Sequence, residues 1–374
     1  MIPFNKPFLS GNELQYMRQA IEAGKISGDG VFTNKCHSFF EKKYGFKKSL
    51  LTTSCTDALE MAALLINIRE GDEVIMPSFT FVSTANPFVL RGARIVFVDS
   101  RTDHPGIDES KIEELITDKT KAIVVVHYAG IACNMDEILR IAAKYNLYVI
   151  EDAAQSVDSF YWDKPLGAIG HLSAFSFHET KNIISGEGGM LAINDDKFSN
   201  RAEILWEKGT NRSAFFRGEI DKYGWVDVGA SFLPSDLIAA FLFAQLENLD
   251  LIQARRKKIW ETYYGELKSL EQKGLLRLPF IPSYATNNGH LFFLLCNNLT
   301  QRDKLLGYLK GKGIHAVFHY QSLHKSNFYK DKHDGRILKN CDLYAECLLR
   351  LPLFYELADS DIKFIVRSVF DFYK

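Results

Sequence analysis

The chain has 374 residues, of which 47% are hydrophobic and 24% are charged, and its formal net charge is −1. This length suggests two or three domains and lets the protein bury a large core without disulfides. The near-zero net charge gives no electrostatic reason to expect nucleic acid as a partner, and the 28 Phe and 16 Tyr argue against a disordered chain.

Neither the apolar runs nor the cysteines indicate a membrane protein or a secreted one. Apolar runs such as 122–126 and 291–296 are far shorter than the roughly 20 residues of a membrane span, and residues 1–6 lack the apolar core of a signal peptide. The six cysteines are scattered without a CxxC pair, which is typical of reduced thiols rather than of disulfides or a zinc site. We therefore expect a cytoplasmic protein with no membrane partner, no nucleic-acid partner and no metal.

Between residues 50 and 195 the pattern alternates strands with helices. In chain order, we expect strands at 50–52, 73–76, 94–98, 121–126, 147–150, 173–177 and 190–193, and helices at 56–67, 108–116 and 134–145. Apolar strands separated by helices predict an α/β protein with a mostly parallel sheet buried on both faces. In such sheets the ligand crevice lies outside the carboxyl ends of the strands, so the residues there are candidates for a site.

After about residue 245 the pattern changes to a long charged helix and a smaller α+β unit. We expect that helix at 247–266, strands at 292–296 and 314–318, and a helix at 302–312. The predicted domains are thus a large domain at 1–245 and a small C-terminal domain at 246–374. The aromatic, Gly-rich segment 208–229 has no clean period and is interpreted as a long functional loop.

Lys181 is the first candidate for chemistry. It follows the strand expected at 173–177 and precedes the Gly-rich return at 186–189. A lysine on a tight loop at a crevice can be held partly desolvated, which lowers its pKa and lets it form a Schiff base with an aldehyde cofactor. Taken alone, a lysine on a loop is in most proteins a solvated surface charge.

Three further strand ends carry polar or aromatic candidates. Asp152 could keep a pyridinium nitrogen protonated, although it could also cap a helix. Ser54, Cys55 and Thr56 stand where a helix N-terminus would suit a phosphate, although an ordinary N-cap has the same pattern. Phe81 could stack on a flat ring or belong to the core.

The order of these features is that of the pyridoxal-phosphate enzymes with the aspartate-aminotransferase fold, fold type I. The chain resembles the sugar-nucleotide aminotransferases of the DegT type over nearly its whole length. This resemblance rests on residues 2–4, 77–81, 151–155 and 319–320 and on His324. Within the family, the most similar subgroup is the TDP-4-keto-6-deoxyglucose 4-aminotransferases of the WecE type, through residues 176–182, 208–213, 215–218 and 349–355.

The resemblance implies roles around the ring of the cofactor, pyridoxal 5'-phosphate. Lys181 would carry the Schiff base, and Asp152 would pair with the pyridine nitrogen. Gln155 would contact the phenolic oxygen of the ring. Phe81 would stack on the ring.

The resemblance also implies a phosphate site. Ser54, Cys55, Thr56 and Ser176 would hold the phosphate, and Ser231 would reach it from a neighbouring subunit. Many relatives carry Asn at the position of Ser231 and Arg at position 233, where this chain has Leu, and a leucine cannot replace the charge of an arginine.

Two groups of residues are candidates for binding the nucleotide sugar. Lys208, Arg212 and Arg217 could grip the diphosphate, because Arg can bind phosphate through two hydrogen bonds, or they could be solvated loop charges. A second group could line the sugar site or form a structural cluster, and it comprises His319, Tyr320 and His324.

The implied reaction is transfer of the amino group of L-glutamate to C4 of TDP-4-keto-6-deoxy-D-glucose, with Lys181 as the general base. The products would be TDP-4-amino-4,6-dideoxy-D-galactose and 2-oxoglutarate, and the assembly a homodimer with shared active sites. Four alternatives stay open: the gluco epimer, another nucleotide-linked keto sugar, a sugar 3-dehydratase, in which histidine replaces the lysine, and a cofactor-binding regulator without turnover. The family suggests a role in cell-surface glycans such as enterobacterial common antigen or lipopolysaccharide.

Overall fold

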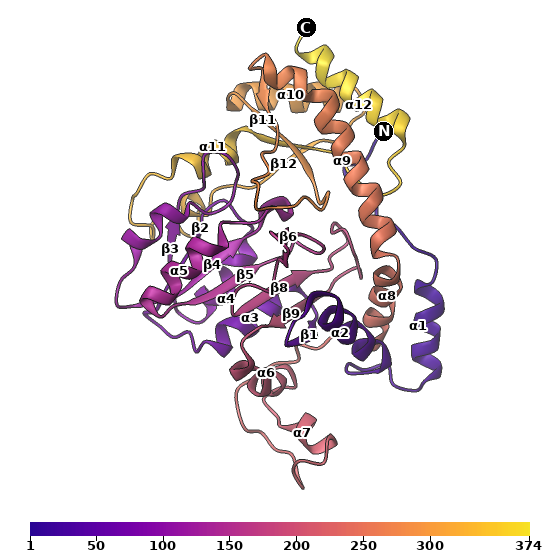
Figure 1. Ribbon diagram of the computed structural model, residues 1–374, viewed down its shortest axis with the longest axis vertical. Coiled ribbons are helices and arrows are strands. Elements are labelled where there is room, and N and C mark those ends of the chain that lie inside the picture. Colours follow the sequence, from indigo (N-terminus) through magenta and orange to yellow (C-terminus); the bar gives the residue numbers. More distant parts are fainter.

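The computed structural model describes residues 1–374 and has a seven-stranded sheet at the centre of its larger part (Figure 1). The strand order is β1-β9-β8-β5-β4-β2-β3. These strands are β1 (Lys48–Thr52), β2 (Glu73–Pro77), β3 (Arg94–Val98), β4 (Thr120–Val126), β5 (Tyr148–Asp152), β8 (Leu172–Ser176) and β9 (Gly189–Ile193). Neighbours from β8 to β3 are parallel, whereas β9 runs antiparallel to both β8 and β1. The predicted mostly parallel sheet is therefore confirmed.

Both faces of this sheet are buried because apolar residues occupy successive positions of each strand. In β4, Val124 packs into the core under α3 (Cys55–Leu65), whereas Val125 packs into the core under α5 (Met135–Tyr145). The side chain of Asn134 accepts a hydrogen bond from the backbone N–H of Glu137 and so begins α5 as predicted. The other helices of this part are α1 (Glu13–Glu22), α2 (Val31–Tyr44), α4 (Asn86–Leu90), α6 (Ser199–Trp206) and α8 (Asp236–Glu247).

A second, four-stranded sheet lies beyond the carboxyl ends of the large sheet (Figure 1). The long helix α9 (Leu249–Gln272) connects α8 to this small sheet. The strand order of the small sheet is β10 (Leu276–Arg277), β11 (Phe292–Cys296), β13 (Leu348–Leu351) and β12 (Val317–Phe318). The helices of this part are α10 (Leu299–Gly311), α11 (Lys339–Cys347) and α12 (Asp359–Phe372). The boundary that we predicted after residue 245 falls in the last turn of α8, and the division into two domains stays a prediction.

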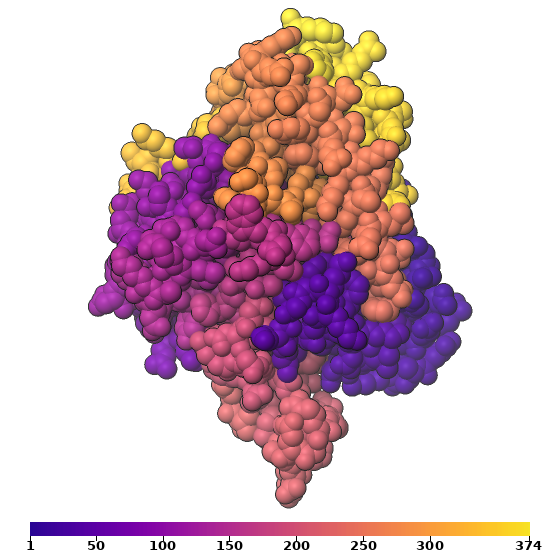
Figure 2. Space-filling model, in the orientation of Figure 1, coloured from indigo at the N-terminus to yellow at the C-terminus, as the bar shows by residue number.

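The segment 208–229 projects from the body of the protein at the end opposite the small sheet (Figure 2). It contains the short helix α7 (Arg212–Phe216) and otherwise only turns, bends and isolated bridges, in agreement with the predicted long loop. No single helix is long and apolar enough to cross a membrane. The pair formed by α8 and α9, bent by 63°, meets the length and composition criteria only when both are taken together.

Two expected elements differ from the structure. In place of a helix at 108–116 there are two 3-10 turns, Glu109–Lys111 and Glu113–Leu115, because the N–H groups here donate to the carbonyl three residues earlier, as Lys111 does to Asp108. The strand expected at 314–318 shrinks to β12, because Ile314 pairs with Ile2 of the N-terminal segment instead of extending the ladder with β13. A small hairpin of β6 (Phe160–Tyr161) and β7 (Lys164–Pro165) was also not expected.

Candidate active site

A cavity of about 610 Å³ lies between the carboxyl ends of the large sheet and the small sheet. The strand-end residues that line it from the large sheet are Ser54, Cys55, Thr56, Thr80, Phe81, Asp152, Gln155, Ser176 and Lys181. Its opposite wall comes from the C-terminal part of the chain and includes His319, Tyr320 and Arg350. The crevice expected from the strand-end rule is therefore where the candidates for chemistry meet.

Lys181 reaches this cavity from a tight loop between β8 and β9. The N–H of Lys181 donates to the carbonyl of His178 at 2.8 Å, and the N–H of Ser185 donates to the carbonyl of Phe177 at 2.7 Å. The side-chain amine has no hydrogen-bond or ion-pair partner within the chain. Burial lowers the pKa of Lys181, although Cys55 and Asp152 act against this shift. A larger share of the amine is therefore neutral and able to act as a nucleophile or base.

Asp152 ends β5 with both carboxylate oxygens fixed. The hydroxyl of Thr84 donates to Oδ2 at 2.6 Å, and the N–H of Ala154 donates to Oδ1 at 3.2 Å. Burial raises the pKa of Asp152 because these donors are neutral and no cation touches the carboxylate. A buried carboxylate in this state favours a cationic N–H as a partner.

The N-terminus of α3 forms an anion cradle at the same end of the sheet. Ser54 caps the helix, since its Oγ accepts from the N–H of Asp57 at 3.1 Å. The N–H groups of Cys55 and Thr56 have no acceptor within the chain. At Gly189 a Cβ atom would clash with the backbone of Ser54 and Cys55, so only glycine lets β9 approach this turn so closely. Two free amides and the positive end of a helix suit a phosphate group.

An aromatic ring and an amide complete the floor of the cavity. Phe81 lines it and is 56% exposed, so most of its ring faces open space instead of the core. The Oε1 of Gln155 accepts from the N–H of Ala129 at 2.6 Å, and its Nε2 donates to the hydroxyl of Tyr320 at 3.2 Å. These contacts fix the direction in which the second N–H of this amide points.

Comparison of this chain with known proteins identifies the family to which it belongs. The model of the DegT/DnrJ/EryC1/StrS aminotransferase family matches residues 7–370. The chain belongs to this family. It is also 33% identical to the uncharacterized protein MJ1066 of Methanocaldococcus jannaschii, a match that covers 98% of this chain and 96% of that protein.

Solved structures of family members superpose closely on the whole chain. The aminotransferase TlmJ from Streptoalloteichus hindustanus has a TM-score of 0.91 at 27% identity, covering 100% of this chain and 99% of that one. DesV from S. venezuelae has a TM-score of 0.89 at 26% identity, covering 100% and 98%. An aminotransferase from Psychrobacter cryohalolentis has a TM-score of 0.92 at 25% identity, covering 99% of each chain.

The protein is therefore a sugar aminotransferase of fold type I that uses pyridoxal phosphate, and the expected fold class and cofactor are confirmed. The geometry of the cavity fits this cofactor. Lys181 offers a free amine for the aldehyde, Asp152 a buried carboxylate for the ring nitrogen, and the turn at Ser54 two free amides for the phosphate.

Two of the three residues predicted for the sugar site line the cavity. The rings of His319 and Tyr320 are stacked at 3.8 Å, and the hydroxyl of Tyr128 lies 3.2 Å from Nδ1 of His319. His324 does not line the cavity, which corrects its predicted position. It is buried, with its Nδ1 2.8 Å from Oγ of Ser78, because the 3-10 turn Leu323–Lys325 docks against the end of β2.

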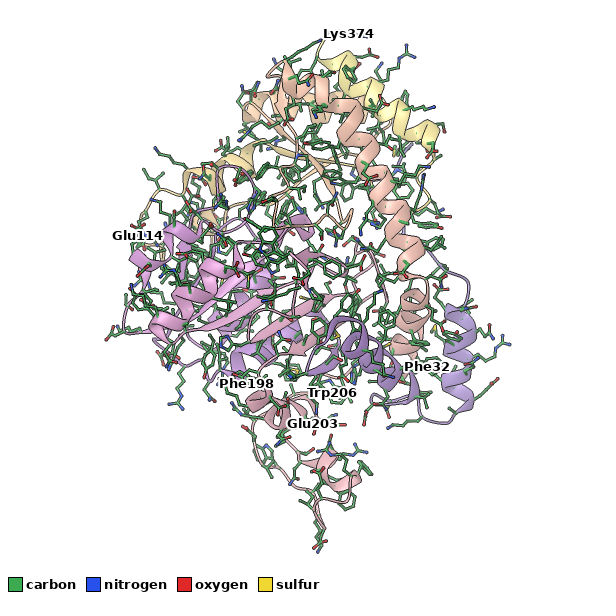
Figure 3. The ribbon with its side chains drawn as sticks, in the orientation of Figure 1. Phe32, Glu114, Phe198, Glu203, Trp206 and Lys374 are labelled. Carbon is green, nitrogen blue, oxygen red and sulfur yellow. The ribbon has the colours of Figure 1, made fainter.

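The loop residues predicted to grip the diphosphate lie away from the cavity of their own chain. Lys208, Arg212 and Arg217 are exposed on the projecting segment. Arg217 pairs with Glu219 at 2.7 Å and with Glu203 at 2.9 Å, and Glu203 lies on α6 at the base of this segment (Figure 3). Ser231 is exposed and also does not line the cavity.

Sequence reasoning missed three features of the site. Arg350 stands in the wall of the cavity, and its only signal was a charge between two leucines of an apolar strand. Thr84 fixes Asp152 from a 3-10 turn, which no pattern indicated. His127 and Glu151 form a buried pair next to Asp152, although each was visible at a strand end.

Proposed function

We propose that this aminotransferase moves the amino group of L-glutamate to C4 of TDP-4-keto-6-deoxy-D-glucose. The products are then TDP-4-amino-4,6-dideoxy-D-galactose and 2-oxoglutarate. The observation that carries the proposal is the unpartnered amine of Lys181, which faces the same cavity as the buried carboxylate of Asp152. The choice of this acceptor is supported by the resemblance of residues 176–182, 208–218 and 349–355 to the subgroup that uses it.

Lys181 performs the proton transfers in this proposal. When bound, pyridoxal phosphate supplies a ring that accepts the negative charge developing on the substrate carbon. The Lys181 amine would act as the base that takes the proton from Cα of L-glutamate. After the keto sugar has replaced 2-oxoglutarate, the same amine returns a proton to C4 of the sugar.

Other residues of the chain hold and shield the reacting groups. Asp152 would hold the ring nitrogen of the cofactor protonated, and Gln155 would contact its phenolic oxygen. Phe81 would pack on the ring. The phosphate would be bound by Ser54, Cys55, Thr56 and Ser176. His319 and Tyr320 close the opposite wall and limit the access of water.

The presence of Lys181 favours amino transfer over the dehydration carried out by related enzymes, in which histidine stands at this position. The face from which Lys181 protonates C4 sets the new stereocentre. The same residues would give the gluco epimer if the sugar bound with its other face toward the amine. A different nucleotide-linked keto sugar is the other alternative for the acceptor.

We also propose that two copies form a homodimer that shares its active sites. The projecting segment exposes large apolar side chains, with Trp225 84% exposed and Phe216 66% exposed. A partner would cover them, because exposed aromatic clusters mark protein interfaces. Lys208, Arg212 and Arg217 would then reach the mouth of the partner's cavity and bind the diphosphate, and Ser231 would approach the partner's cofactor phosphate.

The proposed setting is the cytoplasm, where nucleotide sugars for cell-surface glycans such as enterobacterial common antigen or lipopolysaccharide are made. All six cysteines are free and five of them are buried, as expected of a protein in a reducing compartment.

Product analysis tests the proposal. The protein is incubated with pyridoxal phosphate, L-glutamate and TDP-4-keto-6-deoxyglucose, and the H3–H4 coupling of the product is read by proton NMR. A small coupling means an axial amine and supports the galacto product. A large coupling means the gluco epimer and overturns the stereochemical part. If no aminated sugar forms while the cofactor is bound, the acceptor is another keto sugar or the protein does not turn over.

A further inference from the structure

Arg350 is a partly buried cation in the wall of the cavity, opposite the large sheet. It is the third residue of β13, a strand that is otherwise leucine. Leu349 and Leu351 point into the core of the small sheet, whereas Leu348 packs with the core of the large sheet. Because side chains alternate along a strand, Arg350 shares the face of Leu348 and points into the cavity.

No group of the chain neutralises this charge. The Cζ of Arg350 lies 4.5 Å from the centre of the Phe4 ring, which covers one face of the guanidinium. Its Nε is buried and has no hydrogen-bond partner, and no carboxylate forms an ion pair with the side chain. Burial lowers the pKa of Arg350, opposed only by the phenols of Tyr128 and Tyr320. An unpaired buried cation is costly unless a ligand brings an acceptor.

The position of Arg350 suits an anionic group on a substrate that reacts at Lys181. Both side chains line the same cavity. Burial is the main cause that lowers the pKa of Lys181, and the charge of Arg350 acts in the same direction, so the two cations influence one another. A small anion between them would relieve this repulsion.

We propose that Arg350 binds a carboxylate of the amino donor L-glutamate, and of the product 2-oxoglutarate, through two parallel N–H···O bonds. This inference rests on the proposed function, since it places the donor site in the same cavity. The planar guanidinium matches the geometry of a carboxylate, and the Phe4 ring restricts its plane.

The surroundings of Arg350 favour a carboxylate over the nucleotide diphosphate. Arg350 is a single cation beside Tyr128, Phe293 and Tyr320, and one carboxylate balances its charge. A diphosphate carries more negative charge and needs several cations, which the projecting segment offers in Lys208, Arg212 and Arg217.

The test compares Arg350→Gln, Arg350→Lys and the wild type, with Arg91→Gln as a matched control because Arg91 is exposed on the turn after α4. Binding of 2-oxoglutarate to the cofactor-loaded proteins is measured by calorimetry. The half-reaction with L-glutamate alone is followed by the absorbance of the cofactor. Binding of TDP is measured in parallel, and unfolding of the unliganded proteins is followed by circular dichroism.

We expect Arg350→Gln to bind 2-oxoglutarate at least about 30-fold more weakly, because a hydrogen-bonded charge is lost. The concentration of L-glutamate that half-saturates the rate of the half-reaction should rise by a similar factor. Arg350→Lys should lose less affinity for 2-oxoglutarate than Arg350→Gln, since lysine keeps the positive charge but cannot form two parallel hydrogen bonds. Binding of TDP should stay within about threefold of the wild type. The melting temperature of Arg350→Gln should be unchanged or higher, whereas a purely structural arginine would lower it.

Unchanged affinity of Arg350→Gln for 2-oxoglutarate would overturn the inference, and so would a loss confined to TDP, which would assign Arg350 to the nucleotide. Failure of the proposed function has a different signature. If the wild type converts its cofactor with L-glutamate but does not aminate the keto sugar, the acceptor is wrong, while a defect of Arg350→Gln in the glutamate half-reaction would still support the donor site.

Discussion

The Nε2 of His127 and Oε2 of Glu151 lie 2.9 Å apart, and both side chains are fully buried. The pair adjoins Asp152, since Glu151 precedes it in β5 and the N–H of His127 donates to its carbonyl at 3.2 Å. Glu151 also accepts from the backbone N–H groups of Gly167, Ile169 and Gly170. The backbone N–H of Cys133 donates to Nδ1 of His127 at 3.2 Å, so the ring proton is on Nε2, which donates to Glu151. The carboxyl end of β5, which carries Asp152, is therefore anchored in the core by a buried hydrogen bond between His127 and Glu151.

Replacement of His127 should destabilise the protein, because the buried carboxylate of Glu151 loses its side-chain donor. Burial raises the pKa of Glu151, but the hydrogen bonds from His127, Gly170 and Gly167 outweigh it and lower the pKa, so this stability is present above pH 4.5 and disappears as the pH falls through the folded pKa. We expect His127→Ala to lose ~3–5 kcal/mol of unfolding free energy at pH 7 and less at acidic pH. Urea unfolding of both proteins between pH 4 and 7 checks this, and equal stability of the two proteins at pH 7 would contradict it.

Lys181→Ala should abolish turnover and the visible chromophore that borohydride reduces, because no other amine reaches the cavity from this loop. The exposed Lys164→Ala serves as a control and should behave as the wild type. Absorbance and mass spectrometry after reduction provide the readout. If Lys181→Ala retains both a reducible cofactor adduct and activity, the assignment of Lys181 is wrong.

Asp152→Ala should bind the cofactor weakly and lose most activity, since no other carboxylate lines the cavity at this position. Thr84→Val removes the 2.6 Å hydrogen bond that orients Asp152 and should have a smaller effect, about 10- to 100-fold in activity. Cofactor titration and steady-state kinetics measure both variants. Near-normal kinetics in Asp152→Ala would exclude its role at the ring nitrogen.

Mixing two inactive variants tests the shared dimer. Subunits with Lys181→Ala keep an intact projecting segment, and subunits with Arg212→Ala and Arg217→Ala keep an intact lysine. If the segment serves the partner's cavity, hybrid dimers contain one complete site, and about a quarter of the wild-type activity should return after random reassociation. Sedimentation must show a dimer, and a fully active monomer would contradict the proposal.

The parts of the site that could be predicted from sequence are those set by local rules. Asp152 ends a buried strand and Lys181 lies on the tight loop that follows another, and the topology of a parallel sheet brings such strand ends together. Ser54 could be anticipated as a cap from the pattern around α3. These residues lie between 54 and 181, where strands and helices alternate regularly.

The remaining features depend on contacts between distant segments, which periodicity does not encode. His324 lies near the motif residues in sequence, but Ser78 holds it in the interface between β2 and the turn after β12. Arg350 was hidden because its orientation depends on which face of β13 meets the large sheet. The turns at 109–115 resemble a helix in composition, but their N–H groups bond to carbonyls three residues earlier, a difference that composition does not reveal.

The close approach of Gly189 to the turn at Ser54 shows that the anion cradle is built from residues in the first part of the chain. This has a consequence for how the protein is made. All residues that form the anion cradle and carry the reactive amine lie before residue 190, whereas Arg350 is among the last 25 residues. During translation the residues of the cofactor half of the cavity emerge from the ribosome long before Arg350. A chain arrested between these two points would hold the elements that bind pyridoxal phosphate but not the arginine that we assign to the amino donor.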